Sequence, residues 1–92
     1  MNSTTTTAEL FEALVKRFPK AWFKDGGEFA TNYDNSIWTG EGSYIGKERM
    51  FDYYDMSAKY NFGAHRTLCK FVEDRGYYVE CYDPGTYFIY PQ

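Results

Sequence analysis

The chain has 92 residues, the size of a single domain spanning 1–92, and its formal net charge is −3. Thirteen acidic residues against ten basic ones argue against a general nucleic-acid binder, because such proteins gain most of their affinity from lysine and arginine on phosphate. Aromatic residues make up 22% of the sequence, and ten of them are tyrosines, so rings must build much of the core.

The chain shows no secretory leader pattern, and no apolar run approaches the roughly 18 residues that indicate a membrane-spanning helix. We therefore expect a soluble protein of the cytoplasm. Its two cysteines, Cys69 and Cys81, are expected to be free thiols, because disulfides are rare in reducing compartments.

A Thr-rich leader at 1–6 precedes the first predicted helix. Thr6 and Glu9 fit a capping box, in which each side chain accepts a hydrogen bond from the backbone N–H of the other residue. Apolar residues then recur at helical spacing and stop before Pro19, which predicts a helix over 7–18 that packs on a sheet. The apolar stripe consists of Leu10, Phe11, Leu14, Val15 and Phe18.

The middle of the chain places turn residues between short aromatic runs. Residues 20–33 indicate a hairpin that turns at the Asp-Gly-Gly sequence of 25–27, since these residues tolerate positive φ. Residues 36–56 predict further short strands separated by glycines. We expect residues 57–62 to form a connection between elements.

The last third of the chain predicts a second helix followed by a hairpin. Apolar spacing indicates a helix over 64–75, with Gly76 as its C-terminal cap. A turn at 83–85 then joins strands over 77–82 and 86–90. The helix stripe expected to be buried consists of His65, Leu68, Cys69 and Val72, with Phe71 at its edge.

The order of elements predicts an α+β fold, in which an antiparallel β-sheet of four to five short strands carries two helices on one face. Alternate residues of a strand face opposite sides of the sheet. We therefore expect about half of the tyrosines in the tail to be core, and the rest to form a ring-rich face toward solvent. Tyr77, Val79 and Cys81 are expected to face the helices, and Tyr78, Glu80 and Tyr82 the other side.

A catalytic site has little support in the sequence. His65 and Cys69 lie four residues apart on one predicted helix face, a spacing that also suits a Cys–His nucleophile. The favoured interpretation is a core histidine beside a core thiol, since a mid-helix cysteine lacks the exposure of a nucleophile. One histidine and two cysteines match no zinc-ligand spacing, and no phosphate-binding loop occurs. We therefore expect no enzyme, no cofactor and no metal.

Charge is unevenly distributed along the chain. Between residues 25 and 55, an acidic block places seven acidic residues against two basic ones. Two interpretations stay open: ordinary solvated surface, or an acidic face with aromatic anchors that docks on a basic partner. The candidate partner-binding residues are Asp25, Glu28, Asp34, Trp38, Glu41, Tyr44 and Asp55. Ahead of the block, a basic patch that is a candidate RNA contact consists of Lys16, Arg17 and Lys20.

Longer stretches of the sequence resemble a group of phage proteins. The stretch FGAH…LCKFVEDRGYYVECYDPGTYFIYP, over 62–91, resembles small proteins carried by tailed bacteriophages and prophages, with an FG-x-H start and a YD-x-G-T turn. The stretches FPKAWFKDGGEF and WTGEGSYI fit the same pattern, so the resemblance covers nearly the whole chain after the leader. The size, the aromatic content and the acidic block are similar to those of type I-F anti-CRISPR proteins.

This resemblance implies a phage-encoded, non-enzymatic inhibitor that acts in the host cytoplasm. It would bind the protein subunits of the host type I-F crRNA-guided CRISPR surveillance complex, with guide RNA as a further candidate contact, and block target DNA binding. It implies no membrane and no small-molecule substrate. Two alternatives stay open: a phage structural or accessory interaction protein, and a single-stranded nucleic-acid-binding module that stacks bases on its rings.

Overall fold

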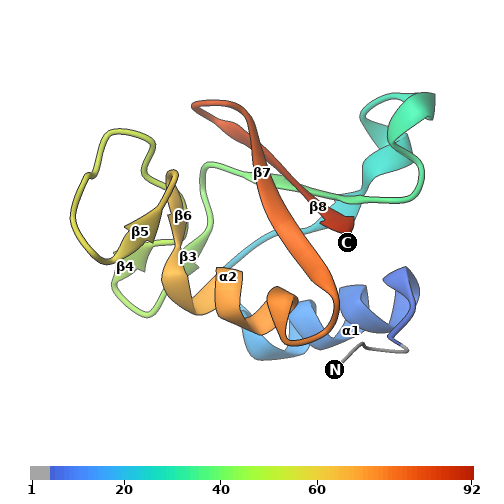
Figure 1. Ribbon diagram of the computed structural model, residues 1–92, viewed down its shortest axis with the longest axis horizontal. Helices are drawn as coiled ribbons and strands as arrows, with labels where there is room; N and C mark the ends of the chain where they lie inside the picture. The colour runs from blue at the N-terminus through green and yellow to red at the C-terminus, as the bar shows by residue number, and fades with distance from the viewer. Residues whose placement is uncertain (1–4) are drawn as a thin grey trace.

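We analysed a computed structural model of the protein, which describes residues 5–92 (Figure 1). Within that range the chain forms two α-helices, two short 3₁₀ helices, a four-stranded antiparallel sheet and two two-stranded ribbons, which confirms the predicted α+β class. Residues 1–4 of the expected Thr-rich leader lie outside the described residues.

The helices are α1 (Thr7–Arg17), η1 (Gly26–Glu28), η2 (Thr31–Tyr33) and α2 (Arg66–Glu73). The strands are β1 (Lys24–Asp25), β2 (Ile37–Gly40), β3 (Tyr44–Ile45), β4 (Glu48–Arg49), β5 (Tyr60–Asn61), β6 (Ala64–His65), β7 (Tyr77–Asp83) and β8 (Thr86–Pro91).

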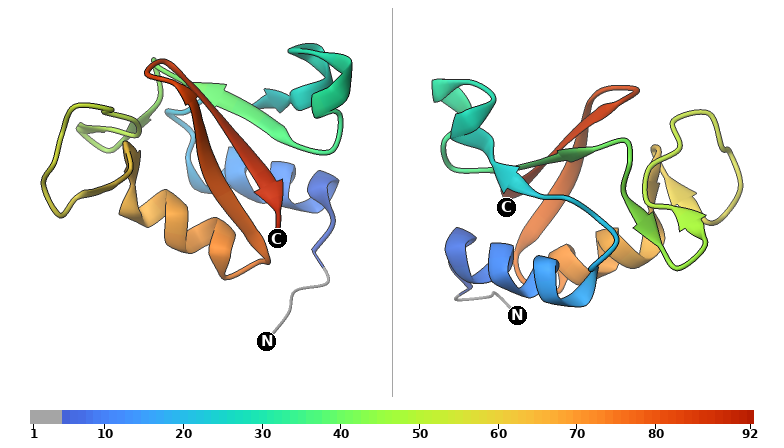
Figure 2. Two further views of the ribbon diagram at one scale, coloured as in Figure 1. Left: turned by 45° about the horizontal axis from the view of Figure 1, so that its top comes forward. Right: turned by 180° about the vertical axis from the view of Figure 1, so that it is seen from behind.

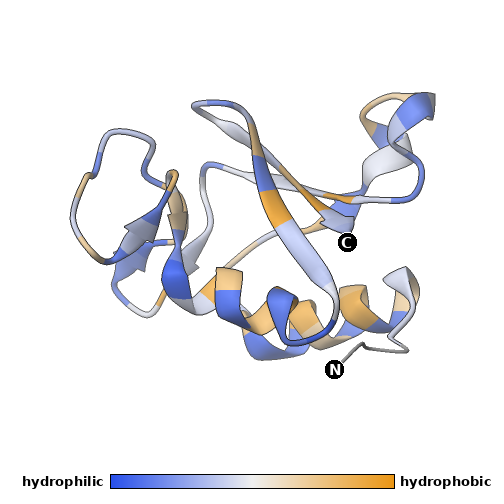
Figure 3. Cartoon of the chain, viewed as in Figure 1, coloured by the Kyte–Doolittle hydropathy of each residue, from blue (hydrophilic) through white to orange (hydrophobic). Residues whose placement is uncertain are grey.

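The main sheet has the strand order β1-β2-β8-β7, so β8 lies between β2 and β7, and β7 forms one edge. Both α-helices cover the same face of this sheet, as Figure 2 shows from two sides. The core lies between them, where Ile37, Tyr87 and Ile89 of the sheet meet Leu14 and Leu68 of the helices. Hydrophobic and hydrophilic residues alternate along both helices (Figure 3), which lets one side of each helix pack inward.

Helix α1 begins as the sequence predicts. The Thr6 N–H donates to Glu9 Oε1 at 2.9 Å, and the Glu9 N–H donates to Thr6 Oγ1 at 3.1 Å, which completes the capping box. Leu10, Leu14 and Phe18 of the predicted stripe are buried. Val15 is not, because 49% of its surface is exposed, so the buried stripe is narrower than predicted.

The tight turn predicted for the first hairpin, at residues 25–27, is wrong. The chain does not reverse at 25–27; it runs through η1 and η2, and β1 then pairs with β2 so that Lys24 lies opposite Trp38. The Gly26 N–H donates to the Ser36 carbonyl at 2.9 Å, and a Cβ at Gly26 would overlap Ser36. Glycine therefore serves a close approach of two chain segments here, and not a tight turn.

The segment that replaces the tight turn covers the outer face of the sheet. Tyr33 stacks on Phe88 with ring centroids 4.6 Å apart, and Phe29 meets the Phe88 ring edge-on at 5.0 Å. Phe88 is consequently only 1% exposed, although it lies on the face opposite the helices. The predicted ring-rich face toward solvent is thus limited mainly to Tyr78 and Tyr82 of β7.

The C-terminal hairpin forms as predicted, and its two faces are assigned correctly. Tyr77 is buried, and Val79 and Cys81 pack against the core from the helix side. A register shift between Cys81 and Asp83 interrupts the pairing of β7 with β8 near the turn. Gly85 in the turn does not adopt a positive φ, and the Asp83 carboxylate accepts its N–H at 3.0 Å.

The second helix starts two residues later than predicted. Ala64 and His65 form β6, which pairs with β5 in the segment expected to be a connection. His65 is instead the N-cap of α2, and its Nδ1 accepts the Thr67 N–H at 3.2 Å. The helix also ends two residues earlier than predicted: its C-cap is Asp74, and Gly76, with φ of 86°, forms the turn that follows and not the cap itself.

Burial of Phe88 between the sheet and the 3₁₀ segment generates a stability prediction. We expect Phe88→Ala to lower the free energy of unfolding by about 3–5 kcal/mol, because it leaves a cavity under Phe29 and Tyr33. Since this approaches the whole stability of a small domain, Phe88→Leu should also be measured, with a smaller loss of about 1–2 kcal/mol.

Urea unfolding followed by tyrosine and tryptophan fluorescence measures these losses. Tyr78→Ala is the matched control, since Tyr78 lies on the same outer face but is exposed, and it should cost about 1 kcal/mol or less. Equal losses at Phe88 and Tyr78 would show that the 3₁₀ segment does not bury the outer face.

Candidate functional site

Three of the predicted acidic residues come together in one groove. Asp25, Glu28 and Asp34 line it from β1, η1 and the end of η2, and Glu12 joins them from the outer side of α1. We call this cavity of about 420 Å³ the acidic groove; Phe11 and Ile37 contribute to its apolar lining. Glu12 was not predicted from the sequence, because contact between α1 and the 3₁₀ segment leaves no signal in local spacing.

Local hydrogen bonds hold the walls of the acidic groove. The Gly27 N–H donates to Asp25 Oδ1 at 2.8 Å, which fixes this carboxylate at the start of η1. On the α1 side, the Thr7 hydroxyl donates to Asn35 Oδ1 at 3.3 Å and lies 3.2 Å from the Tyr77 hydroxyl. These bonds join the first turn of α1 to the 3₁₀ segment and to β7.

The electrostatic character of the acidic groove is uniform. No lysine or arginine lines it among residues 5–92, and none of its four carboxylates belongs to an ion pair between described residues. Uncompensated carboxylates attract basic groups and repel phosphate. The groove therefore suits a lysine- or arginine-bearing protein surface better than a nucleic-acid backbone.

The other predicted partner-binding residues lie elsewhere. Glu41 and Tyr44 line a shallow cavity of about 170 Å³ beside Arg49. Asp55 lines a different, larger groove. The acidic block thus supplies several separate surfaces, and the single acidic face suggested by the sequence is not formed.

Trp38 is part of the packing of the sheet. Its ring meets Trp22 edge-on at 5.5 Å and Phe29 at 5.3 Å, and the Lys24 ammonium lies 5.6 Å from its centre. The side chain is half-buried. Its indole therefore stabilises the outer face, with one part left free for a contact.

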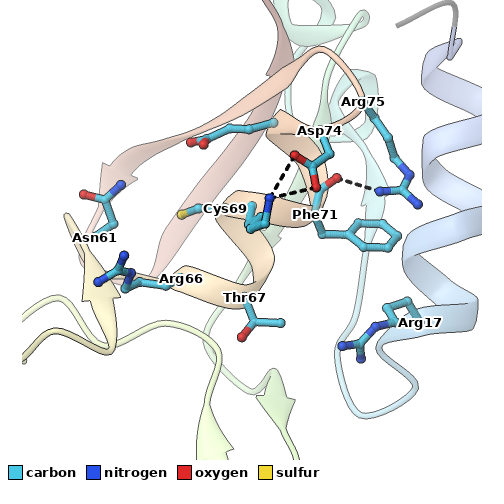
Figure 4. A pocket seen from close by; sticks show the side chains of 10 residues that line it. Arg17, Asn61, Arg66, Thr67, Cys69, Phe71, Asp74 and Arg75 are labelled. Carbon is cyan, nitrogen blue, oxygen red and sulfur yellow. Dashed lines mark hydrogen bonds and ion pairs between the residues drawn. The ribbon is translucent and has the colours of Figure 1, made fainter. Parts of the chain in front are cut away.

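Cations gather in a separate groove of about 580 Å³ along α2, which we call the basic groove (Figure 4). Arg75 stacks on Phe71 with its guanidinium 3.7 Å from the ring centre and donates to the Phe71 carbonyl at 2.9 Å. Figure 4 shows Arg17, which comes from α1, on the other side of the Phe71 ring. Lys16 and Lys20 are exposed but do not line this groove, so only one residue of the predicted RNA contact lies in it.

Part of the positive charge in the basic groove is already neutralised. Lys70 pairs with Asp74 at 3.2 Å, and Glu73 also lines the groove. Arg66 donates to the Ala58 carbonyl at 3.3 Å. The basic groove is therefore mixed in charge, whereas the acidic groove is not.

His65 and Cys69 do not form a nucleophilic pair. His65 Nε2 lies 2.7 Å from Glu48 Oε1, and its Nδ1 serves as the cap of α2, so both ring nitrogens are engaged. The Cys69 thiol is directed at the Ala64 carbonyl at 3.8 Å, and burial raises its pKa to about 11. Both side chains are buried, which confirms the core interpretation, and both Cys69 and Cys81 are free.

Residues 5–92 contain no group of three histidine, cysteine, aspartate or glutamate side chains placed to hold a metal ion. Over the same range, none of the helices has the length and apolar character needed to cross a membrane.

Comparison with known proteins adds no family to this picture. No protein-family model matches the sequence, and no curated protein and no solved structure matches the chain. The resemblance to phage proteins therefore stays a prediction, and function is inferred from the geometry and charge of the residues in the grooves.

The contact of Glu48 with Lys59 and His65 generates a pH prediction. The Lys59 ammonium, 2.8 Å from Glu48 Oε2, and then the His65 ring lower the pKa of Glu48 from its usual value of 4.5. A lowered pKa means that the ionised carboxylate stabilises the fold above pH 4.5, and that this contribution is lost as the pH falls through the folded-state pKa. We expect Glu48→Gln to lower the urea midpoint at neutral pH and to lower it less near pH 3.

Urea unfolding of the native protein and of Glu48→Gln, at neutral pH and near pH 3, measures these midpoints. Asp74→Asn is the matched control, because it removes an exposed pair with Lys70 that contributes little at either pH. A Glu48→Gln deficit that is the same at both pH values would contradict the assigned role of the carboxylate.

Proposed function

We propose that the protein is a phage-encoded, non-enzymatic inhibitor that acts in the host cytoplasm by binding a basic surface of the type I-F crRNA-guided CRISPR surveillance complex. Binding there would block access of target DNA. The observation that carries the proposal is the acidic groove, where four carboxylates face one cavity and no lining cation offsets them among the described residues.

The shape of the acidic groove supports a protein partner. Its apolar lining can receive the methylene stem of a lysine or arginine, while the carboxylates at its walls pair with the charged end. Surfaces that bind DNA present such side chains in number, so they offer a ready counterpart. Charge complementarity of this kind raises the association rate and favours basic partners over acidic ones.

The alternative of single-stranded nucleic-acid binding has less support. Phe29 and Tyr33 cover Phe88 on the outer face, so fewer rings are free to stack on bases than the sequence predicted. The acidic groove lies next to this segment and would repel a phosphate backbone. The cations of the basic groove are partly neutralised by their neighbours.

A gel-shift titration tests the proposed function. The purified type I-F surveillance complex, labelled target DNA and increasing amounts of this protein are mixed, with lanes of this protein and DNA alone. We expect loss of the target shift at near-stoichiometric protein and no shift by the protein alone. An undisturbed target shift rejects inhibition of this complex, and a shift by the protein alone favours the nucleic-acid alternative.

Charge reversal tests the acidic groove itself. We expect Glu28→Lys and Asp34→Lys each to weaken binding to the surveillance complex by on the order of tenfold, because each places a cation where the partner presents one. Biolayer interferometry with immobilised complex measures the affinity, and urea unfolding should be unchanged, since both side chains are exposed.

Glu80→Lys is the matched control for charge reversal. It makes the same change of charge on the exposed outer side of β7, away from the acidic groove. Binding at native strength by the two groove variants, or equal weakening by Glu80→Lys, would show that the acidic groove is not the contact.

A further inference from the structure

A third groove lies apart from the acidic and the basic grooves. It runs between the segment 53–63 and the end of β7 with the turn that follows. In Figure 1 the segment 53–63 lies at the left of the view, and the end of β7 with its turn lies at the top. Its volume is about 770 Å³, larger than that of the acidic groove. We call it the tyrosine groove; the residues that matter here are Tyr53, Asp55, Tyr60, Phe62, Tyr82 and Asp83.

The lining of the tyrosine groove combines rings with carboxylates. Phe62 is 91% exposed, Met56 92% and Tyr82 54%, so several large side chains border one cavity without burying one another. Single exposed apolar residues are common, but a cluster around a cavity marks an interaction site. Asp55 and Asp83 add negative charge, and no cation lines the groove in the part of the chain described.

Phe62 adopts a backbone conformation that a bulky residue rarely takes. It has φ of 54° and is followed by Gly63 with φ of 88°, in the two-residue turn between β5 and β6. Asparagine, aspartate or glycine normally occupies such a turn position. The exposed Phe62 ring gives little packing in return, so the strain points to a contact outside the chain.

A buried tyrosine hydroxyl lies behind the groove. The Tyr87 side chain is fully buried, its hydroxyl makes no hydrogen bond of ordinary geometry to a described residue, and burial followed by the neighbouring Cys81 thiol raises its pKa. A Cβ at Gly63, which lines the groove, would overlap this hydroxyl oxygen, so glycine is needed for the backbone to pass close to it. The neighbouring Cys81 thiol donates to the Asp83 carbonyl at 3.2 Å instead. Because its oxygen is inaccessible to solvent, this hydroxyl supports the groove from behind and offers no direct contact to a ligand.

We propose that the tyrosine groove binds an arginine side chain presented by a protein partner. A guanidinium can stack on the tyrosine rings and donate its N–H groups to the carboxylates of Asp55 and Asp83. Its methylene stem packs against Met56 and Phe62. The proposal does not depend on the surveillance complex, because it concerns a different surface from the acidic groove.

The charge of the groove is maintained at neutral pH. Hydrogen bonds from the side chain and the backbone of Ser57, the latter at 2.8 Å to Asp55 Oδ1, lower the pKa of Asp55. The carboxylate is therefore ionised and held in place before any partner arrives. Arginine fits such a site better than lysine, since its planar group both stacks and forms paired hydrogen bonds.

Binding of a short peptide tests whether the tyrosine groove accepts an arginine side chain. The probe is acetyl-Leu-Arg-Leu-amide, titrated into the ¹⁵N-labelled full chain while ¹H–¹⁵N spectra are recorded. The control peptide carries citrulline, which has the shape of arginine without the charge. We expect saturable shifts at the amides of Asp55, Gly63 and Asp83, and an affinity at least fivefold lower for the citrulline peptide.

Variants assign the binding to the groove. We expect Tyr82→Ala to weaken binding of the arginine peptide about fivefold, whereas Tyr78→Ala, on the same side of β7 but outside the groove, leaves it unchanged. Phe62→Asn should also weaken binding about fivefold while raising the urea midpoint, because asparagine suits the positive φ. That combination separates a binding role of Phe62 from a role in folding.

Three results would overturn the proposal that the tyrosine groove binds arginine. Equal affinity for the arginine and citrulline peptides overturns the proposal, as does binding that Tyr82→Ala leaves intact. Shifts confined to Asp25, Glu28 and Asp34 would place the arginine in the acidic groove instead and reject the tyrosine groove. Since no surveillance complex is present, each result is independent of the inhibition assay.

Discussion

The fold depends on burying both faces of one strand. In β8, Tyr87, Phe88 and Ile89 are consecutive and all buried, so their side chains must be covered from two sides. The helices cover Tyr87 and Ile89, and the segment with η1 and η2 covers Phe88. A chain of this size has few residues to spare for two layers, which explains why large rings fill so much of the interior.

The sequence predicted what local chemistry determines. The capping box at Thr6, the positive φ of Gly76 after α2 and the hairpin turn at 83–85 each depend on a few adjacent residues, and the structure contains all three. The turn at 25–27 failed because Asp-Gly-Gly suits a 3₁₀ start as well as a tight reversal. The acidic groove was predicted in part, since Glu12 reaches it only through tertiary packing.

Helix α1 links the two oppositely charged regions. Glu12 and the first turns of α1 border the acidic groove, and Arg17 at its last turn lines the basic groove. Glu9 in the first turn of α1, and Lys16 and Arg17 in its last turn, interact favourably with the helix dipole. The separation of charge along the molecule is therefore compatible with the stability of α1. A charged partner that approaches in the electrostatic field of the protein is oriented before contact.

The edge strand β7 determines whether two copies of this protein can pair through their sheet edges. Seven residues of β7 have a strand partner on one side only, and such an edge usually invites another strand. The register shift near Cys81 bends this edge, and the exposed Glu80 carboxylate stands in its middle. Two copies aligned edge to edge would bring like charges together across a distorted ladder. The fold thus protects itself from the strand-by-strand growth that leads to fibrils.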